Sequence, residues 1–493
     1  MTDPTLRRLA LRTLLAAFTG TELPGRAADL VAAGLGGYAL FGYNIVDRPQ
    51  VASLVGALRD VRADVIVAID EEGGDVTRLG HATGSAYPGN AALGVVDDVS
   101  LTRAVHRAIG VELASLGVTL DMAPTVDVNT ADDNPVIGTR SFGADPARVA
   151  AHAAAAVDGL QEAGVAACAK HFPGHGATIT DSHHDLPVID APLDVLRRRD
   201  LPPFAAAIEA GVRAVMTAHI RVPAITGDLP ATLSPAALGG LLRGELGFDG
   251  VIVSDALEMR GASGVLGLPE TAVRTLAAGC DLLCIGGEFG KTDDAYATVE
   301  AIVDALVAAV RDGRLPAERL EDAAARVALL AAAGGPCPGC RDVVDSRLGL
   351  DAARRALRVE GVMPNGGGTP LVVHLESPPT IAAGEVPWGL TAHVHPDDVV
   401  RVPAGADGEA AAEVMARAGA RPVVVVSRDT HRHGWARSLV EKLTAAHPEV
   451  VLVEMGWPAS WRPAGLHGYV ATYGAARVNG QAAAERVLHN HQQ

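Results

Sequence analysis

The sequence predicts an α/β fold, in which a TIM-type (β/α)8 barrel is followed by a smaller α/β domain with a parallel-sheet sandwich. Three observations support this prediction. Short apolar runs alternate with alanine-rich helical segments, eight such runs can be counted, and polar residues end most of the later ones. A doubly wound open sheet is the alternative. The count of eight and the polar strand ends favour the barrel.

The eight candidate strands occupy the first two thirds of the chain. They lie near Leu15–Gly20, Gly37–Phe41, Val65–Asp70, Thr119–Pro124, Ala167–Phe172, Ala214–Ile220, Val251–Asp255 and Leu282–Gly286. Between them, apolar residues recur at helical spacing, as in Asp145–Ala163. A barrel of this kind typically needs about 250 residues, so the spacing leaves room for long loops.

A break rich in glycine, proline and cysteine follows the last of these helical segments. We predict a barrel domain over 1–333, a linker over 334–368 and a small α/β domain over 369–493. The small domain has candidate strands at Leu371–Leu375, Pro422–Ser427, Val450–Glu454 and Tyr469–Tyr473, with helices at Gly408–Ala418 and Trp435–Ala446.

The composition is that of a globular protein with an acidic surface. Of the 493 residues 48% are hydrophobic, and the net charge of −17 argues against nucleic-acid and anionic membrane partners. Arg12 interrupts the apolar N-terminal stretch, and no apolar run approaches the roughly 20 residues of a membrane helix. Five cysteines in a long chain favour a reducing compartment, so we expect a cytoplasmic protein.

Polar residues recur where the predicted barrel strands end. They are Asp70, Asp121, Lys170, His171, His219 and Asp255. The carboxyl ends of barrel strands carry the active site, so these side chains are expected to converge although they are far apart in sequence. Capping of the following helices explains one or two of them but not the whole set.

The most distinctive motif is KHFPGHG at Lys170–Gly176, followed by TDSH at Thr180–His183. Asp181 and His183 are two residues apart, so the carboxylate can orient the imidazole and raise its basicity for acid/base work. We expect His175 to brace the glycine-rich turn, and His184 is assigned no role.

Three further motifs carry carboxylates or arginine. An apolar strand delivers Asp255, which can attack an anomeric carbon or, alternatively, cap the next helix. Asp70 begins DEEGG and is suited to accept hydrogen bonds from vicinal hydroxyls, whereas Glu71 is expected to be a solvated acid of the turn. Arg140 in IGTRSFG can donate to sugar oxygens or form a surface salt bridge.

Together these motifs resemble glycoside hydrolase family 3, in particular its bacterial β-N-acetylglucosaminidase branch. The segments that carry the resemblance are IDEEGGDVTRL, DMAPTVDV, IGTRSFG, AKHFPGHG, TDSH and VSDALEM, in this order. They extend over the whole predicted barrel. The C-terminal segment matches the family's second domain only in type.

The resemblance implies a role for each matching residue. Asp255 matches the nucleophile, His183 the histidine acid/base and Asp181 its partner. The residues that match those binding the sugar's hydroxyls are Asp70, Arg78, Arg140, Lys170 and His171. There are departures, since the family often has Asp, Gln and Arg where this chain has Ala177, Glu71 and Asp75.

The expected function is therefore removal of β-linked N-acetylglucosamine from a non-reducing end, with retention, in a role such as muropeptide turnover. Because an imidazole need not repel an anion, a β-N-acetylglucosaminide phosphorylase of the same fold is an alternative. Another is a metal-dependent barrel hydrolase using His171, His175, His183, His219 and Asp255. An inactive sugar-binding protein is a third. We expect a glycoside substrate, no cofactor and no metal, and leave a homo-oligomer open.

Overall fold

The computed structural model describes residues 3–180, 186–264, 266–286, 294–333, 347–364, 368–406 and 409–488. The chain packs into two compact units. The first comprises Met1–Glu72, Val99–Pro135 and Ala144–Val344, and the second comprises Gly73–Asp98, Val136–Gly143 and Asp345–Gln493. Two segments of the second unit thus come from within the range 1–333 that the sequence assigns to the barrel.

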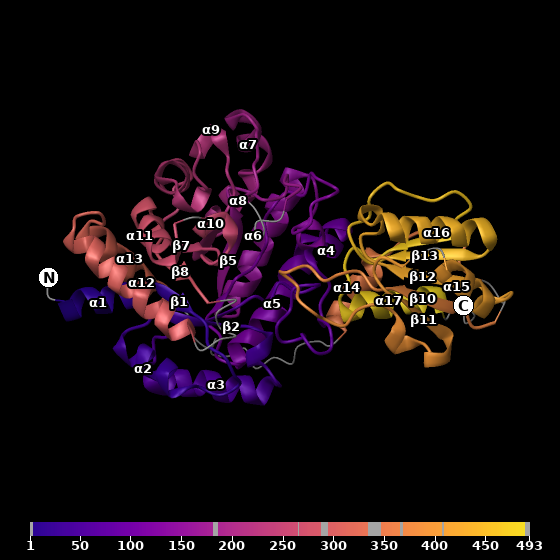
Figure 1. Ribbon diagram of the computed structural model, residues 1–493, viewed down its shortest axis with the longest axis horizontal. Helices are drawn as coiled ribbons and strands as arrows, with labels where there is room; N and C mark the ends of the chain where they lie inside the picture. Colours follow the sequence, from indigo (N-terminus) through magenta and orange to yellow (C-terminus); the bar gives the residue numbers. More distant parts are fainter. Residues whose placement is uncertain are drawn as a thin grey trace. The chain divides into compact units, whose positions relative to one another are not determined.

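The first unit is built around an eight-stranded sheet that is parallel throughout (Figure 1). Its strands are β1 (Leu14–Ala16), β2 (Gly37–Leu40), β3 (Ile66–Ile69), β4 (Leu120–Asp121), β5 (Ala166–Phe172), β6 (Ala214–Thr217), β7 (Val251–Ser254) and β8 (Leu283–Cys284). They follow one another in the order β7-β6-β5-β4-β3-β2-β1-β8, and a bridge between Val253 and Leu282 joins the two ends. The predicted barrel is confirmed, and every observed strand overlaps a predicted one.

Helices precede, connect and follow the barrel strands. They are α1 (Asp3–Arg12), α2 (Gly25–Ala33), α3 (Arg48–Val61), α5 (Val99–Ser115), α6 (Pro146–Glu162), α7 (Leu193–Arg199), α8 (Pro202–Glu209), α9 (Pro223–Thr226), α10 (Arg260–Ser263), α11 (Leu268–Ala278), α12 (Asp294–Arg311) and α13 (Ala317–Ala333), with a π-helix at Ala236–Glu245. Local sequence sets their starts. Asp145 caps α6 by accepting from the backbone N–H groups of Ala147 and Arg148, and Pro146 occupies the first helical position.

The interior of the barrel is filled by alternate residues of its strands. The inward set includes Ile66, Ala68, Ala166, Cys168, Ala214, Met216, Val251 and Val253, and Val327 and Leu330 of α13 pack against it. Arg319 and Arg326 of α13 donate to the backbone oxygens of Cys280 and Asp249, which precede β8 and β7. Helix α13 therefore closes the amino-terminal end of the barrel and leaves function to the carboxyl end.

The second unit contains a six-stranded sheet in the order β11-β10-β12-β13-β14-β9. Its strands are β9 (Arg358–Gly361), β10 (Leu371–Leu375), β11 (Val399–Val402), β12 (Val423–Ser427), β13 (Val450–Glu454) and β14 (Gly468–Ala471), and its helices are α4 (Asn90–Val96), α14 (Leu348–Ala356), α15 (Glu409–Ala418), α16 (Gly434–Ala446) and α17 (Arg477–Leu488). Five strands are parallel, of which four were predicted and β11 was not, while β9 pairs antiparallel with β14 at the edge. The sequence did not reveal β9 because its four side chains are all exposed and lack an apolar pattern.

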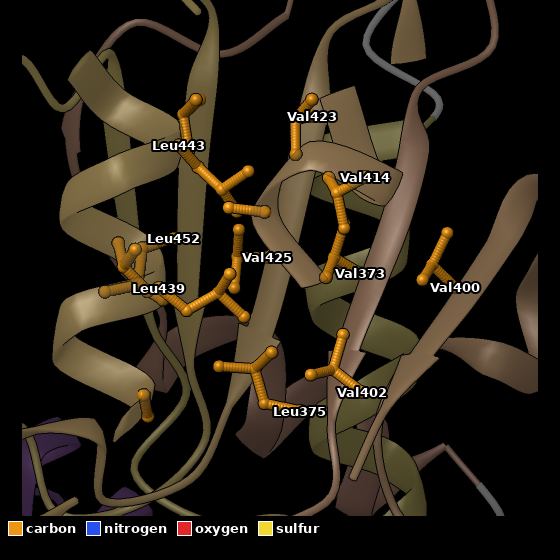
Figure 2. Packing of buried hydrophobic residues seen from close by; sticks show 14 of the residues in the cluster. Val373, Leu375, Val400, Val402, Val414, Val423, Val425, Leu439, Leu443 and Leu452 are labelled. Atoms are coloured by element: carbon orange, nitrogen blue, oxygen red, sulfur yellow. The ribbon is translucent and has the colours of Figure 1, made fainter. Parts of the chain in front are cut away.

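Both faces of this sheet are covered by apolar side chains, which explains the nearly continuous valine runs in its strands. One layer joins Val373, Val425 and Leu452 to Val414 of α15 and Leu439 of α16. Figure 2 shows this layer, with the helical leucines pointing toward the strands. The opposite layer includes Val424, Val451 and Val470 with Ala484 and Val487 of α17.

Cys168, Cys280 and Cys284 are buried and unpaired with one another. Cys337 and Cys340 lie outside the described residues. Across the part of the chain that the structure describes, no helix combines the length and the apolar character that a membrane crossing requires.

Candidate active site

Lys170 ties two acidic groups together at the carboxyl end of the barrel. Its Nζ atom donates to Asp70 Oδ1 at 2.7 Å and lies 2.8 Å from Glu72 Oε1. The side chains of Lys170 and Glu72 are 3% and 2% exposed, whereas Asp70 is 16% exposed. Asp70 is thus the member of this trio that reaches solvent, and its orientation is set by a buried cation.

A further buried carboxyl group contacts the turn that carries this trio's acids. Asp121, at the end of β4, accepts a hydrogen bond from the Glu71 backbone N–H at 3.0 Å, and Thr125 Oγ1 donates to Glu72 Oε2 at 3.1 Å. Burial raises the pKa of Asp121 well above its usual range. The expectation that Glu71 is a solvated acid is wrong, because the turn that carries it folds into the barrel and Glu71 is buried.

Asp127 holds the KHFPGHG turn in place. Its carboxylate accepts hydrogen bonds from the His171 ring at 2.8 Å and from the backbone N–H groups of His171 and His175 at 3.3 and 2.6 Å. Burial alone would raise the pKa of Asp127, but the adjacent His171 and the His175 N–H hold it below its usual value. The anion therefore fixes the orientation of the His171 imidazole, which lies directly after Lys170.

The side chain and the backbone of His175 both make contacts within the protein. Its Nδ1 atom lies 2.8 Å from Thr178 Oγ1, and its backbone oxygen accepts from Asn134 Nδ2 at 3.0 Å. Gly176 beside it leaves no room for a side chain, because a Cβ there would be 2.0 Å from the Val128 oxygen. These contacts make His175 a brace of the glycine-rich turn.

Asp255 follows β7 directly and is partly exposed. Its Oδ1 atom accepts a hydrogen bond from the Ala256 backbone N–H at 2.8 Å. The next helix, α10, begins at Arg260 with Met259 as its capping residue. Asp255 is therefore not the cap of that helix, and the alternative raised by the sequence is removed.

The carboxylates that follow β3 and β7 raise the pKa of the same buried thiol. Burial raises the pKa of Cys284, and the negative charges of Glu258, Asp255 and Asp70 raise it further. Asp70 is far from Asp255 and Glu258 in the sequence. Because all eight barrel strands are parallel, the ends of β3 and β7 lie at the same end of the barrel, and Asp70 and Asp255 follow these two strand ends, as the strand-end argument predicts.

His219 was a candidate metal ligand, but the protein engages both of its ring nitrogens. Nδ1 lies 2.8 Å from Thr232 Oγ1 and Nε2 lies 3.0 Å from the Ala256 oxygen. No group of three or more His, Cys, Asp or Glu side chains within the described ranges is arranged to hold a metal ion. The described residues thus give the metal-dependent hydrolase no ligand set.

Arg78 and Arg140 belong to the second unit. Arg140 is buried, its Nη1 atom donates to the Val136 oxygen at 3.1 Å, and its own carbonyl accepts from Asn90 Nδ2 at 2.7 Å. Arg78 Nη1 donates to the Ala383 oxygen at 3.5 Å. Arg140 is therefore not the surface salt-bridge residue that the sequence left as an alternative.

Asp181, His183 and His184 lie outside the described residues, so the acid/base pair stays a prediction. Among the described residues, the sequence motifs did not indicate a role for Glu72, Thr125, Glu258 or Asp127. Asp127 could have been noticed, since it lies in DMAPTVDV six residues after the end of β4, but nothing in the sequence pairs it with His171.

We expect the protein to lose stability in acid because three of its histidines are buried. Burial lowers the pKa values of His106, His175 and His374 to about 4, whereas an unfolded histidine titrates near 6.5. Between these values the unfolded chain binds more protons than the native one, so the free energy of unfolding falls as the pH falls. We expect a loss of about 2 to 3 kcal/mol per histidine between pH 7 and pH 4.5.

Urea denaturation of the wild type and of His106→Gln at both pH values measures this effect, with His395→Gln, at an exposed position, as the control. The His106 variant should lose less stability on acidification than the other two proteins. An equal loss in all three would contradict the assignment to His106.

Comparison with known proteins first gives the class, that of barrel glycoside hydrolases. The family model "Glycosyl hydrolase family 3 N terminal domain" matches residues 23–330. The chain therefore belongs to glycosyl hydrolase family 3, and the resemblance drawn from its motifs is confirmed.

The relatives extend this result. Beta-hexosaminidase A of Pseudoalteromonas piscicida is 35% identical over 391 residues, which cover 73% of this chain and 65% of that relative. Beta-hexosaminidase LpqI of Mycobacterium tuberculosis is 40% identical over 296 residues, or 58% of this chain and 73% of the relative. The solved family 3 beta-N-acetylglucosaminidase from Paenibacillus sp. str. FPU-7 is 33% identical with a TM-score of 0.85, covering 98% of this chain and 96% of that one.

Proposed function

We propose that this chain is a retaining β-N-acetylhexosaminidase that removes β-linked N-acetylglucosamine from the non-reducing end of a glycoside. The observation that carries the proposal is that Asp255 follows β7 and Asp70 follows β3, so that both residues lie at the carboxyl end of one parallel barrel. The family match and the names of the relatives support it.

In the proposed reaction Asp255 attacks the anomeric carbon while His183 protonates the departing oxygen, and the glycosidic bond breaks as the bond to Asp255 forms. Asp181 orients the imidazole of His183. In the second step His183 takes a proton from water, whose oxygen attacks the anomeric carbon and releases Asp255. Two inversions give net retention.

The sugar is proposed to be held by Asp70, Lys170 and His171, with Arg78 and Arg140. For Asp70, the support is a carboxylate that reaches solvent while Lys170 fixes its direction. For His171, it is the buried Asp127 anion that orients the ring. Each group is thus held in one geometry before a ligand arrives, which lowers the ordering cost of binding.

We further propose that the enzyme works in the cytoplasm on fragments of cell-wall muropeptides. The support for this location is the odd number of cysteines in a long chain.

The proposal is tested by the stereochemistry of the first product. With an aryl β-N-acetylglucosaminide as substrate and proton NMR as the readout, we expect the β-anomer of N-acetylglucosamine to form before mutarotation. The matched aryl β-glucoside serves as the control for substrate class. An α-anomer formed first, or no cleavage of any aryl β-N-acetylhexosaminide, would refute the proposal.

A phosphorylase is the second candidate, favoured by the histidine at the acid/base position. A neutral imidazole near the leaving oxygen does not repel phosphate as a carboxylate would. We expect free N-acetylglucosamine as the main product with and without phosphate. Phosphorus NMR measures any sugar-1-phosphate that forms. An amount that increases in proportion to phosphate would mean that the activity is phosphorolysis and not hydrolysis.

A further inference from the structure

The carboxylate of Asp75 joins three stretches of chain that are far apart in sequence. Its Oδ1 atom accepts a hydrogen bond from the Ala475 backbone N–H at 2.7 Å, and its Oδ2 atom accepts from Thr139 Oγ1 at 2.7 Å. Asp75, Thr139 and Ala475 belong to the three separate stretches that make up the second unit. One side chain therefore ties all three together.

The two early stretches also pack tightly against each other. A Cβ added at Gly94 would lie 1.8 Å from the Phe142 oxygen, so α4 and the 136–143 stretch are in direct backbone contact. Asn90 Nδ2 donates to the Arg140 oxygen at 2.7 Å. The backbone of Arg140 is thus held from the α4 side by a buried amide.

The first stretch is bonded in turn to the C-terminal part of the unit. Arg358 Nη2 donates to the Val95 oxygen at 2.8 Å, and Arg355 Nη2 lies 2.8 Å from Asp98 Oδ2. A Cβ at Gly349 of α14 would lie 1.9 Å from the Ala86 oxygen. These contacts hold the far end of the stretch, while Asp75 holds its start.

We infer that Asp75 is a positioning residue for sugar binding, which acts by holding Arg78 and Arg140. Arg78 lies three residues after Asp75, and Arg140 follows Thr139 directly. Where the family often has an arginine, this chain has a carboxylate that faces Thr139 and Ala475. The inference rests on the proposed function, in which both arginines bind the sugar, and it gives the C-terminal segment a role in that binding.

The test compares two substitutions that differ in what they preserve. Asp75→Ala removes both acceptors. Asp75→Asn keeps an oxygen for the Ala475 N–H, and its amide can donate to the Thr139 hydroxyl, which accepts as well as donates. We expect Asp75→Ala to raise KM roughly 10-fold or more with kcat changed about threefold at most, and Asp75→Asn to restore KM to within about threefold of wild type.

Asp397→Ala, at an exposed carboxylate of the same unit, is the matched control. Should Asp75→Ala fail to fold, a second pair of variants tests the hydrogen bond from Thr139 Oγ1 to Asp75. Thr139→Val removes this bond, whereas Thr139→Ser keeps it. Hydrogen exchange of residues 73–80 and 136–143 should rise in Asp75→Ala but not in Asp75→Asn.

A wild-type KM in a folded Asp75→Ala protein would overturn the inference, even with increased exchange, because the tie would then be structural only. Equal KM values for Asp75→Ala and Asp75→Asn would do the same. Failure of the proposed function has a different signature, namely a wild-type protein that cleaves no aryl β-N-acetylhexosaminide.

Discussion

Asp255→Asn is expected to lower kcat/KM on an aryl β-N-acetylglucosaminide by roughly 10⁴-fold. The amide is a poor nucleophile and cannot form the glycosyl ester, so the first step of the proposed reaction is blocked. The fold should be unaffected, since the remaining amide oxygen still accepts from the Ala256 N–H, the contact that Asp255 Oδ1 makes at 2.8 Å. Steady-state kinetics together with a thermal melt separates the two effects.

Covalent trapping identifies the nucleophile independently. A 2-deoxy-2-fluoro glycosyl donor slows turnover of the intermediate, and peptide mapping should place the label on Asp255. Asp228→Asn, at a fully exposed carboxylate, is the control and should behave as wild type. A label on another residue, or near-normal turnover by Asp255→Asn, would disprove the assigned role.

Lys170→Met is expected to destabilise the protein by about 3 to 5 kcal/mol and to abolish measurable sugar binding. The loss arises because Asp70 and Glu72 would face each other without the cation that lies 2.7 and 2.8 Å from them. A buried carboxylate left without its partner costs far more than an exposed ion pair contributes. Denaturant unfolding and ligand titration measure the two losses.

The double variant Lys170→Met/Glu72→Gln separates stability from binding. Removing the buried negative charge should restore part of the free energy of unfolding but not the binding, because the direction of Asp70 remains unfixed. Lys442→Met, at an exposed position of the second unit, serves as the control. Recovery of full activity in the double variant would mean that Lys170 has no part in holding the sugar.

The barrel could be predicted because its strands are fully buried and therefore appear as short apolar runs. The site could be outlined because the carboxyl ends of parallel barrel strands must meet, which groups Asp70, Lys170 and Asp255 without any knowledge of distances. The direction of each side chain could not be predicted. Glu71 shows this, since an acid in a glycine-rich turn resembles a solvated residue until the turn folds inward.

The sequence also did not reveal which segments make up the second unit. Its early stretches are held by tertiary contacts, such as Gly94 against Phe142 and Arg358 to the Val95 oxygen, which leave no local pattern. Strand β9 was missed for a related reason, because an exposed edge strand has no need of apolar alternation. The periodicity of apolar residues indicates which face of an element is buried. It does not indicate which distant segment packs against that face.

The three-part construction of the second unit has a consequence for biosynthesis. Ribosomes release a chain from its N-terminus at about 5 to 20 residues per second, and roughly 250 residues separate Asp98 from Asp345. The stretch that carries Asp75 and Arg78 therefore leaves the ribosome about 10 to 50 seconds before α14, and the Ala475 turn that completes its bonding follows Asp75 by about 20 to 80 seconds. During that interval the nascent polypeptide presents an unfinished surface, and this is the period in which a chaperone would be of most use.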